Sequence, residues 1–489
     1  LQRSFDALFH QRATLPSAAA EQALVGLERY TSRLAATSTL LSAGAESVPK
    51  IMHFVWVGGS EVGNIQRDYM NIWREVLAPQ GYTFNLWYDR DALLAFEMNR
   101  VILDSARVHA MESGGDRETN PAALSRLIED RARLLKWQMS TYLSQPQWAG
   151  RADEARIDLM VRAYGKDRTV LEAFRQQCLD SHLAMVGPDL RLRDAAQEFS
   201  EHFLRDVYQR EIGMRGNFAA ASDVVRLQAL HLEGGRYSDM DYLPPLAEKL
   251  GAVDISSLKK SALIGVLQLL LNHDDSLMPG RDRQRYGDRT DTVPAEYKEA
   301  LLAFARGQPG VREIFVPPQD SSVAQDGIRL GTAFGSQGSG EMNAHILAHP
   351  GSGMTQAIMQ TIRFNYDCLQ EVERRLAIAG IASGDEDRLF DVAQNVINER
   401  TAEGRLTQSR LMSFKNLLSA MFTYYQDGIR TGARGTITLT GPGAAVTGLS
   451  DYTETHLGFE QLDAVRARLK LTDGYNVFTE EEMISGWTV

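Results

Sequence analysis

The sequence predicts a mixed α/β protein, and three features of the chain lead to this prediction. A short apolar run, IMHFVWV at 51–57, stops at two glycines and is typical of a buried strand that enters a turn. Apolar residues then recur at helical spacing in NIQRDYMNIWREVLA, and TFNLWYD at 83–89 has the composition of a second strand. A strand, a helix and a strand in this order indicate a parallel α/β unit, because parallel strands need a crossover connection.

Length and composition narrow the class of protein. A chain of 489 residues with 44% hydrophobic and 24% charged residues is typical of a globular protein with one main domain and large additions. A net charge of −11 argues against nucleic acid as the main partner, because phosphate binding needs clustered Lys and Arg. The two cysteines, Cys178 and Cys368, lie far apart, so we expect core thiols rather than a disulfide framework or a zinc finger.

The remaining elements are predicted in chain order. Residues 1–48 contain the amphipathic stretch AAEQALVGLERYTSRLAA and are expected to form an N-terminal helical segment. The main domain is then placed at 49–489, with an almost wholly helical insertion at about 92–215. The stretch 217–235 is a helix by propensity that ends at a glycine pair, and RYSD after it is a short strand.

The C-terminal half carries several further expectations. The segment GTAFGSQGSG at 331–340 is rich in glycine and serine and is expected to be a mobile loop. Long helices are predicted at about 352–377 and 405–426. The segment GTITLTGPGAA at 435–445 has alternating β-branched residues before Gly-Pro-Gly, which predicts a strand and a turn.

Two carboxylates stand out in GGRYSDMDYLPPL at 234–246. Asp239 and Asp241 are separated by one residue, and on a strand such residues point to the same face and can converge on one cation. Oxygen ligands of this kind suit Mn²⁺ or Mg²⁺, which commonly accompany a diphosphate. The alternative is a solvated acidic turn.

Three other side chains are candidates for the same site. Asp223 and Arg226 are three residues apart on the predicted helix, where they form either an ordinary ion pair or an acceptor and a donor for sugar hydroxyls. Trp56 follows a buried strand, at the carboxyl edge where open α/β sheets bind ligands. It is either a core residue or a stacking platform for a base.

Four segments show a resemblance to a known family. HFVWVGG, NFAAASDVVRLQALHLEGGRYSDMDYLP, TITLTGPGA and EEMISGW occur in the same order as similar segments in the glucosyltransferase domain of the large clostridial cytotoxins. The resemblance covers about residues 49–489 and implies a GT-A fold, a Rossmann-like core with helical insertions. It further implies a secreted or translocated toxin that acts in the host cytosol, where it transfers a sugar from a UDP-sugar to a Rho or Ras family GTPase with retention.

The resemblance also assigns roles to individual residues. Trp56 would stack on uracil, Ser222 and Tyr237 would hold the nucleoside or the donor phosphate, and Asp223 and Arg226 would hold sugar hydroxyls. Asp239 would contact the ribose and a metal-bound water, and Asp241 would bind Mn²⁺ itself. The C-terminal segment would add Glu482 and Ser485 at the metal and Trp487 at the β-phosphate.

The resemblance places Asn343 near the transferred sugar and implies that its neighbours choose the donor. Small neighbours accompany N-acetylglucosamine and larger ones glucose. The neighbours here are Met342, which fits either donor, and Ala344, which leaves room for an acetamido group, so the pair favours UDP-GlcNAc over UDP-glucose. Asp91 falls where the family has an asparagine near uracil. Weak membrane association through residues 1–48 is also implied, although this segment is shorter than the family's four-helix bundle.

Other readings of the sequence remain open. The protein is alternatively a module that binds a nucleotide sugar without turnover, or a phosphohydrolase in which Asp239 is the nucleophile. The latter requires an apolar strand before the aspartate, which GGRYS lacks. His345 and His349 have the i, i+4 spacing of a zinc pair on a helix, but no H-E-x-x-H motif accompanies them.

Overall fold

The computed structural model describes ten parts of the chain. These are residues 45–113, 120–199, 201–280, 289–318, 321–335, 338–379, 386–403, 416–421, 423–424 and 434–457. The N-terminal segment predicted at 1–48 therefore lies outside the described residues except for its last four. Within those four, strand β1 (Glu46–Ser47) pairs antiparallel with β8 (Ser322–Val323).

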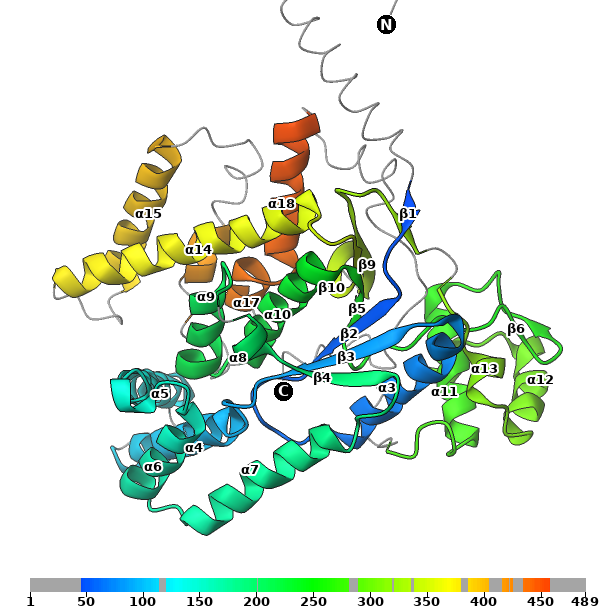
Figure 1. The fold of residues 1–489 in the computed structure, drawn as a ribbon, viewed down its shortest axis with the longest axis horizontal. Coiled ribbons are helices and arrows are strands. Elements are labelled where there is room, and N and C mark those ends of the chain that lie inside the picture. The colour runs from blue at the N-terminus through cyan, green and yellow to red at the C-terminus, as the bar shows by residue number, and fades with distance from the viewer. Residues whose placement is uncertain are drawn as a thin grey trace, which may run out of the picture.

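A six-stranded mixed sheet forms the centre of the molecule (Figure 1). Its strands, in spatial order, are β4 (Leu190–Asp194), β3 (Thr83–Tyr88), β2 (Ile51–Val55), β5 (Gly235–Ser238), β10 (Gly338–Ala348) and β9 (Ile328–Gly335). The first four are mutually parallel, whereas β10 runs antiparallel to both of its neighbours. The predicted parallel unit of β2, helix α3 (Asn64–Leu77) and β3 is confirmed.

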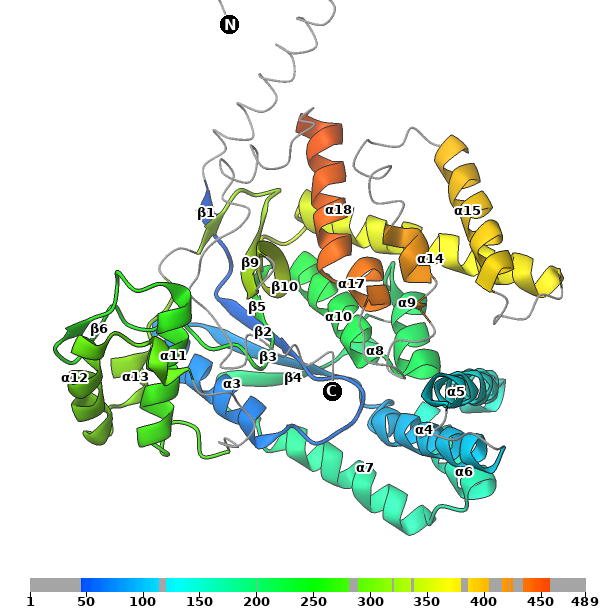
Figure 2. The same cartoon turned by 180° about the vertical axis from the view of Figure 1, so that it is seen from behind.

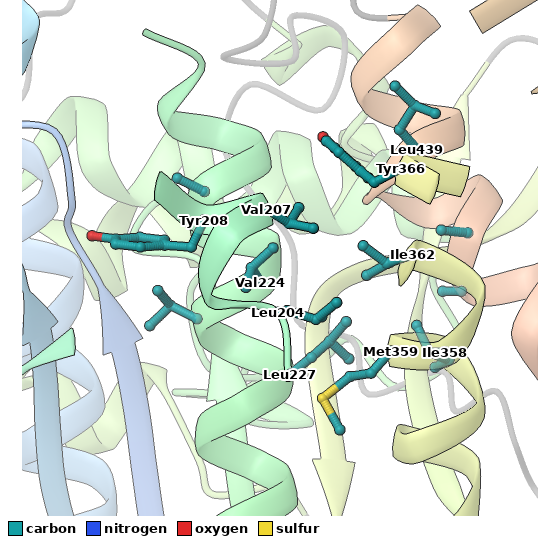
Figure 3. Close-up of a cluster of buried hydrophobic side chains, with 14 of the residues drawn as sticks. Leu204, Val207, Tyr208, Val224, Leu227, Ile358, Met359, Ile362, Tyr366 and Leu439 are labelled. Atoms are coloured by element: carbon teal, nitrogen blue, oxygen red, sulfur yellow. The ribbon is translucent and has the colours of Figure 1, made fainter. Parts of the chain in front are cut away.

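Helices cover both faces of this sheet. Along β2 the side chains alternate, so that Phe54 packs toward α3 and α11 (Lys260–His273), while Val55 packs toward the opposite core. That opposite core is made by α10 (Phe218–Glu233) and α14 (Gly353–Ile378). Figure 3 shows Val224 and Leu227 of α10 facing Met359 and Ile362 of α14.

A helical lobe lies beside the sheet in both views (Figures 1 and 2). Helices α4 (Ala95–Glu112), α5 (Pro121–Leu143) and α6 (Ala152–Tyr164) share a hydrophobic core of their own, and α7 (Arg168–Leu183) adds Leu171 to it. The helices expected between 92 and 215 are thus present, but β4 interrupts them and joins the sheet. The other elements include α8 (Ala195–Glu198), α9 (Arg205–Gln209), η3 (Arg210–Arg215), α12 (Ala295–Arg306), α13 (Val311–Ile314) and α15 (Glu386–Glu403).

Two predictions for the C-terminal half are wrong. Most of the stretch predicted as a mobile loop at 331–340 belongs to the antiparallel strands β9 and β10. The stretch predicted as a strand at 435–445 forms helix α17 (Arg434–Leu439) and the start of α18 (Pro442–Tyr452). The Gly-Pro pair does mark a break, but Pro442 is the first residue of a new helix, a position that tolerates proline because its N–H would have no helical partner.

Several smaller expectations can be compared with the structure. The helix predicted at 352–377 is α14, whereas most of the helix predicted at 405–426 lies outside the described residues. Cys178 and Cys368 are buried free thiols, as expected. His345 and His349 lie on β10 and directly after it rather than on a helix, and the His349 ring contacts the carbonyls of Glu46 and Val323. None of the described helices combines the length and hydropathy needed to cross a bilayer.

Candidate active site

Two of the predicted site residues, Trp56 and Asp239, lie at one edge of the sheet. Strands β2 and β5 are parallel neighbours, with His53 paired to Tyr237. Trp56 therefore follows the carboxyl end of one strand, and Asp239 follows the carboxyl end of the next. Ligands of open α/β sheets bind outside this edge, because the loops that leave neighbouring strands meet there.

The loop that carries Trp56 is tightly packed. The Trp56 side chain is half-buried, and its Nε1 donates to the carbonyl of Ser60 at 3.1 Å. Gly58 and Gly59 both have positive φ, 103° and 73°, and a Cβ on Gly58 would lie 2.0 Å from the ring of Phe218 on α10. Only glycine fits this bend without strain. The loop is thereby pressed against the helix that carries the polar residues of the site.

Arg226 is the centre of a buried polar cluster. Its Nη2 lies 3.1 Å from Asp239 Oδ1 and 3.4 Å from Asp223 Oδ1, and it donates to Ser222 Oγ at 3.2 Å. Its Nη1 donates to the carbonyl of Asn343 at 2.7 Å. The guanidinium carbon also lies 4.5 Å from the centre of the Tyr237 ring, a cation–π geometry. Asp223 and Arg226 of α10 therefore form more than a local ion pair, because the Arg226 side chain also connects this helix to β5 and β10.

A bulge in β10 brings Asn343 into this cluster. The register with β9 shifts between Met342 and Ile346, which pair with the adjacent residues Gly331 and Leu330. The extra residues re-aim the strand, as bulges commonly do beside functional sites. Asn343 Nδ2 donates to Asp223 Oδ1 at 2.7 Å, and the carbonyl of Ala344 accepts from the backbone N–H of Asp239 at 2.7 Å.

Thr440, which the sequence analysis did not single out, completes the surroundings of Asp223. It follows the last residue of α17 and donates through Oγ1 to Asp223 Oδ2 at 2.8 Å. Both side chains are fully buried. Thr440 lies inside TITLTGPGA, one of the four segments that resemble the known family. Its place in that segment is the feature of the sequence that could have identified it as a site residue.

The two carboxylates of the D-x-D pair lie in a turn. Strand β5 ends at Ser238, so the expectation that Asp239 and Asp241 share a strand face is wrong. Asp239 Oδ1 accepts a hydrogen bond from the Tyr237 hydroxyl and forms an ion pair with Arg226. Asp241 is half-buried, and its charge acts on Arg226. Asp239 is thus paired with the guanidinium, and Asp241 lies near enough to influence its charge.

Electrostatics distinguish the members of the cluster. Burial raises the pKa of Asp223 to about 6, although Arg226, Thr440 and Asn343 oppose the shift. Burial also raises the pKa of Asp239, against the effects of Arg226 and Tyr237. Burial lowers the pKa of Arg226, but the surrounding acidic groups outweigh this and hold it above its ordinary value. A permanently charged donor fork and a fixed carboxylate are groups that can hold a polyhydroxyl ligand.

The remaining predicted residues are Glu482, Ser485, Trp487 and Asp91. Glu482, Ser485 and Trp487 lie outside the described residues. Among the residues that are described, no three His, Cys, Asp or Glu side chains are grouped as a metal site. Asp91 instead accepts hydrogen bonds from the backbone N–H groups of Ala152 and Asp153, at 2.8 and 3.3 Å, and holds the start of α6.

Comparison with known sequences identifies similar proteins. The sequence model described as "TcdA/TcdB catalytic glycosyltransferase domain" matches residues 50–439. Cytotoxin-L of Paraclostridium sordellii is 23% identical over 466 residues, and Toxin B of Clostridioides difficile is 23% identical over 423 residues. The alignments cover 90% and 82% of this chain but only 18% and 16% of those toxins. The chain therefore spans less than a fifth of the length of these relatives.

Solved structures share the architecture. The catalytic domain of alpha-toxin from Clostridium novyi has a TM-score of 0.75 and 18% identity, over 99% of this chain and 88% of that one. The UDP-bound glycosyltransferase domain from the YGT toxin has a TM-score of 0.67 and 21% identity, over 91% and 83% of the two chains. The predicted α/β class is confirmed, and the arrangement agrees with a GT-A fold.

Proposed function

Because the chain belongs to the family of TcdA/TcdB catalytic glycosyltransferase domains, we propose that it transfers a sugar from UDP to a hydroxyl side chain of a host protein. Its donor is UDP-GlcNAc in preference to UDP-glucose, its metal is Mn²⁺ or Mg²⁺, and the anomeric configuration is retained. The acceptor is a small GTPase of the Rho or Ras family. One structural relative is a UDP-bound glycosyltransferase domain, which supports a uridine nucleotide as the leaving group.

The cluster around Arg226 is the observation that carries the proposal. It combines a guanidinium, two carboxylates and an amide within one network at the carboxyl edge of the sheet. Asp223 and Arg226 bind hydroxyls of the transferred sugar, and Asn343 lies beside it. Such a set offers both donors and acceptors, which matches a sugar better than it matches a purely apolar or anionic ligand.

The nucleoside half of the donor lies toward the end of β2. Trp56 stacks on uracil, while Ser222 and Tyr237 contact the nucleoside or the phosphate and Asp239 the ribose. The half-buried Trp56 and its glycine-bounded loop support this assignment, because a stacking ring must be held rigidly while one face stays accessible. Base stacking contributes about 1–3 kcal/mol in strand-binding proteins.

The metal is assigned to the turn after β5. Asp239 and Asp241 supply carboxylate oxygens, the kind of ligand atom that Mn²⁺ and Mg²⁺ prefer. Both lie in the turn beside the cluster around Arg226. With Asp241 as direct ligand, Glu482 and Ser485 complete the set, and Trp487 contacts the β-phosphate. These residues would hold the metal, which would supply Lewis-acid chemistry that offsets the charge of departing UDP.

The anomeric configuration is retained because the acceptor oxygen attacks the anomeric carbon from the same face that the phosphate leaves. The bond between the anomeric carbon and the phosphate oxygen breaks, the acceptor oxygen bonds to that carbon, and the departing oxygen takes the acceptor's proton. No protein base is needed. Asp223 is a poor candidate for one, because Asn343 and Arg226 engage its Oδ1 and Thr440 engages its Oδ2.

Donor choice rests on the residues beside Asn343. Ala344 is buried within the bulge of β10, and its side chain is small enough to leave room for an acetamido group. For the acceptor, only membership of the family supports a host GTPase. The same is true of action in the host cytosol and of weak membrane association through residues 1–48.

The test is Mn²⁺-dependent UDP release, compared for UDP-GlcNAc and UDP-glucose, with and without a panel of purified small GTPases. Mass spectrometry of each GTPase then detects the added sugar. UDP release together with a mass gain of one N-acetylhexosamine is the expected result. Binding of UDP-sugar without release from either donor would favour the binding-module alternative, and phosphate release from simple phosphomonoesters would favour the phosphohydrolase.

A further inference from the structure

The carboxylate of Asp223 is held from three elements, and its two oxygens are treated differently. Oδ1 receives the Asn343 amide at 2.7 Å and lies 3.4 Å from the Arg226 guanidinium. Oδ2 receives the Thr440 hydroxyl at 2.8 Å. Within the described residues, Thr440 is the only group that hydrogen-bonds Oδ2. The rotation of the carboxylate about its own axis therefore depends on this hydroxyl.

Thr440 is itself fixed by contacts on both sides. At the preceding turn, Asn217 Nδ2 donates to Thr436 Oγ1 at 2.6 Å, and Asn217 is also the N-cap of α10, the helix that carries Asp223. The N–H groups of Thr440 and Gly441 both bond the carbonyl of Thr436, at 3.1 and 2.9 Å. The hydroxyl thus has a defined position relative to α10.

The second anchor comes from α14. Asn365 Nδ2 reaches the carbonyls of Thr438 and Leu439, both at 3.3 Å, and so caps the end of α17. Figure 3 shows Leu439 beside Tyr366 of α14. A threonine held by two helices is preorganised, which is the arrangement that keeps a functional carboxylate in one rotamer.

We propose that Thr440 is a positioning residue that sets the orientation of the Asp223 carboxylate for the sugar hydroxyls. The inference rests on the proposed function of Asp223 and adds a residue to it. The Thr440 hydroxyl has a second acceptor, the Thr436 carbonyl at 3.3 Å, but its single proton favours the shorter contact to a charged oxygen. Without this hydroxyl, Oδ2 loses its hydrogen bond, and within the described part of the chain the Asp223 carboxylate is held only by the contacts at Oδ1.

The experiment compares Thr440→Val, which keeps the shape and removes the donor, with Thr440→Ser, which keeps the donor. Thr438→Val is the matched control, because it makes the same change two residues earlier, at a half-buried side chain of α17. Steady-state kinetics give kcat and KM for the UDP-sugar, and titration gives the affinity for UDP alone. Retained UDP affinity reports that each variant is folded.

We expect Thr440→Val to lower kcat/KM by about 10-fold to 100-fold, the effect of losing a hydrogen bond to a charged group. The affinity of Thr440→Val for UDP should stay within about twofold of the wild-type value, because UDP lacks the sugar that Asp223 binds. Thr440→Ser should keep most of the wild-type activity. Activity of Thr440→Val equal to that of Thr438→Val would overturn the inference and leave the proposed function intact. A wild-type protein without turnover of any UDP-sugar would overturn both.

Discussion

At the scale of single residues, Arg226 organises the candidate site. Its guanidinium reaches two aspartates, a serine hydroxyl and a backbone carbonyl that come from α10, the turn after β5, and β10. A planar fork can satisfy several acceptors at once, whereas an ammonium is a compact point charge. The geometry of the side chain therefore matters as much as its charge.

Arg226→Lys is expected to lower kcat/KM for the UDP-sugar by at least about tenfold, because buried Asp223 and half-buried Asp239 lose part of their shared partner. Steady-state kinetics measure the effect. The matched control is Arg100→Lys on α4, an exposed arginine paired with Glu97, which should keep wild-type activity. Equal activity in the two variants would contradict the central role of Arg226.

Asp241→Asn is expected to abolish metal-dependent turnover while leaving the fold intact. The amide is nearly isosteric but uncharged, so it weakens binding of a hard cation. UDP release is measured across a range of Mn²⁺ concentrations, and circular dichroism reports the fold. Unchanged turnover in this variant would remove Asp241 from the metal site.

His53 makes stability depend on pH. Burial lowers the pKa of His53 to about 4, whereas an unfolded histidine titrates near 6.5, at about its model-peptide value. Between these values the unfolded His53 binds a proton that the folded His53 does not, so the contribution of His53 to the free energy of unfolding falls as pH drops from about 6.5 to about 4, whereas buried Asp223, with its raised pKa, contributes in the opposite direction. In mid-range the slope is about 1.4 kcal/mol per pH unit.

Urea unfolding at a series of pH values measures this slope. His53→Gln removes the titration along with three hydrogen-bonding contacts, to Gly234, Asn85 and Trp87, so it lowers stability overall but should remove the His53 contribution to the slope between about pH 4.5 and 6. An identical slope in the variant and the wild type would assign the acid sensitivity to other groups.

At the scale of elements, the contact between α14 and α18 decides the position of the turn that carries Thr440. An added Cβ on Gly448 of α18 would lie 2.7 Å from Ile358 Cα and 2.9 Å from Ile358 N on α14. The two backbones are therefore in close approach, and the turn before α18 is placed by that contact.

Gly448→Ala is expected to destabilise the protein by about 1–3 kcal/mol through overpacking, with a parallel loss of activity. Gly213→Ala in η3 is the control, because an added Cβ there meets nothing within 4 Å. Thermal melting compares the two variants. If the Gly448→Ala protein is as stable as the Gly213→Ala protein, close packing of α18 against α14 is not needed for stability.

At the scale of the whole molecule, the proposed donor spans the carboxyl edges of β2 and β5 together with α10 and β10. A ligand that bridges these elements binds the folded state and not the unfolded one, so it stabilises the protein by mass action. At 100 times its dissociation constant, UDP with Mn²⁺ should add about 2.7 kcal/mol. Thermal shift assays measure this, with adenosine diphosphate as the control and a chelator expected to reduce the shift.

Much of this architecture follows from local sequence. The parallel unit around α3, the helix that ends at Gly234 and Gly235, and the short strand before Asp239 were predicted from periodicity and turn residues, and all are present. Asp223 and Arg226 also lie together as their helical spacing predicted. Such features depend on neighbours within one or two turns of the chain, which is the range over which propensity acts.

Only the tertiary structure decided the rest. Residues 435–445 have β-branched alternation but form helices, because packing against α14 outweighs a propensity difference of a few tenths of a kcal/mol per residue. The bulge that turns Asn343 toward Asp223 depends on its neighbouring strands. Asp223 and Thr440 are 217 positions apart, and their hydrogen bond exists because one hydrophobic core packs α10 and α17 against α14. The sequence by itself thus determined many of the elements and most of the candidate residues, whereas long-range packing decided the remaining elements and how the side chains meet.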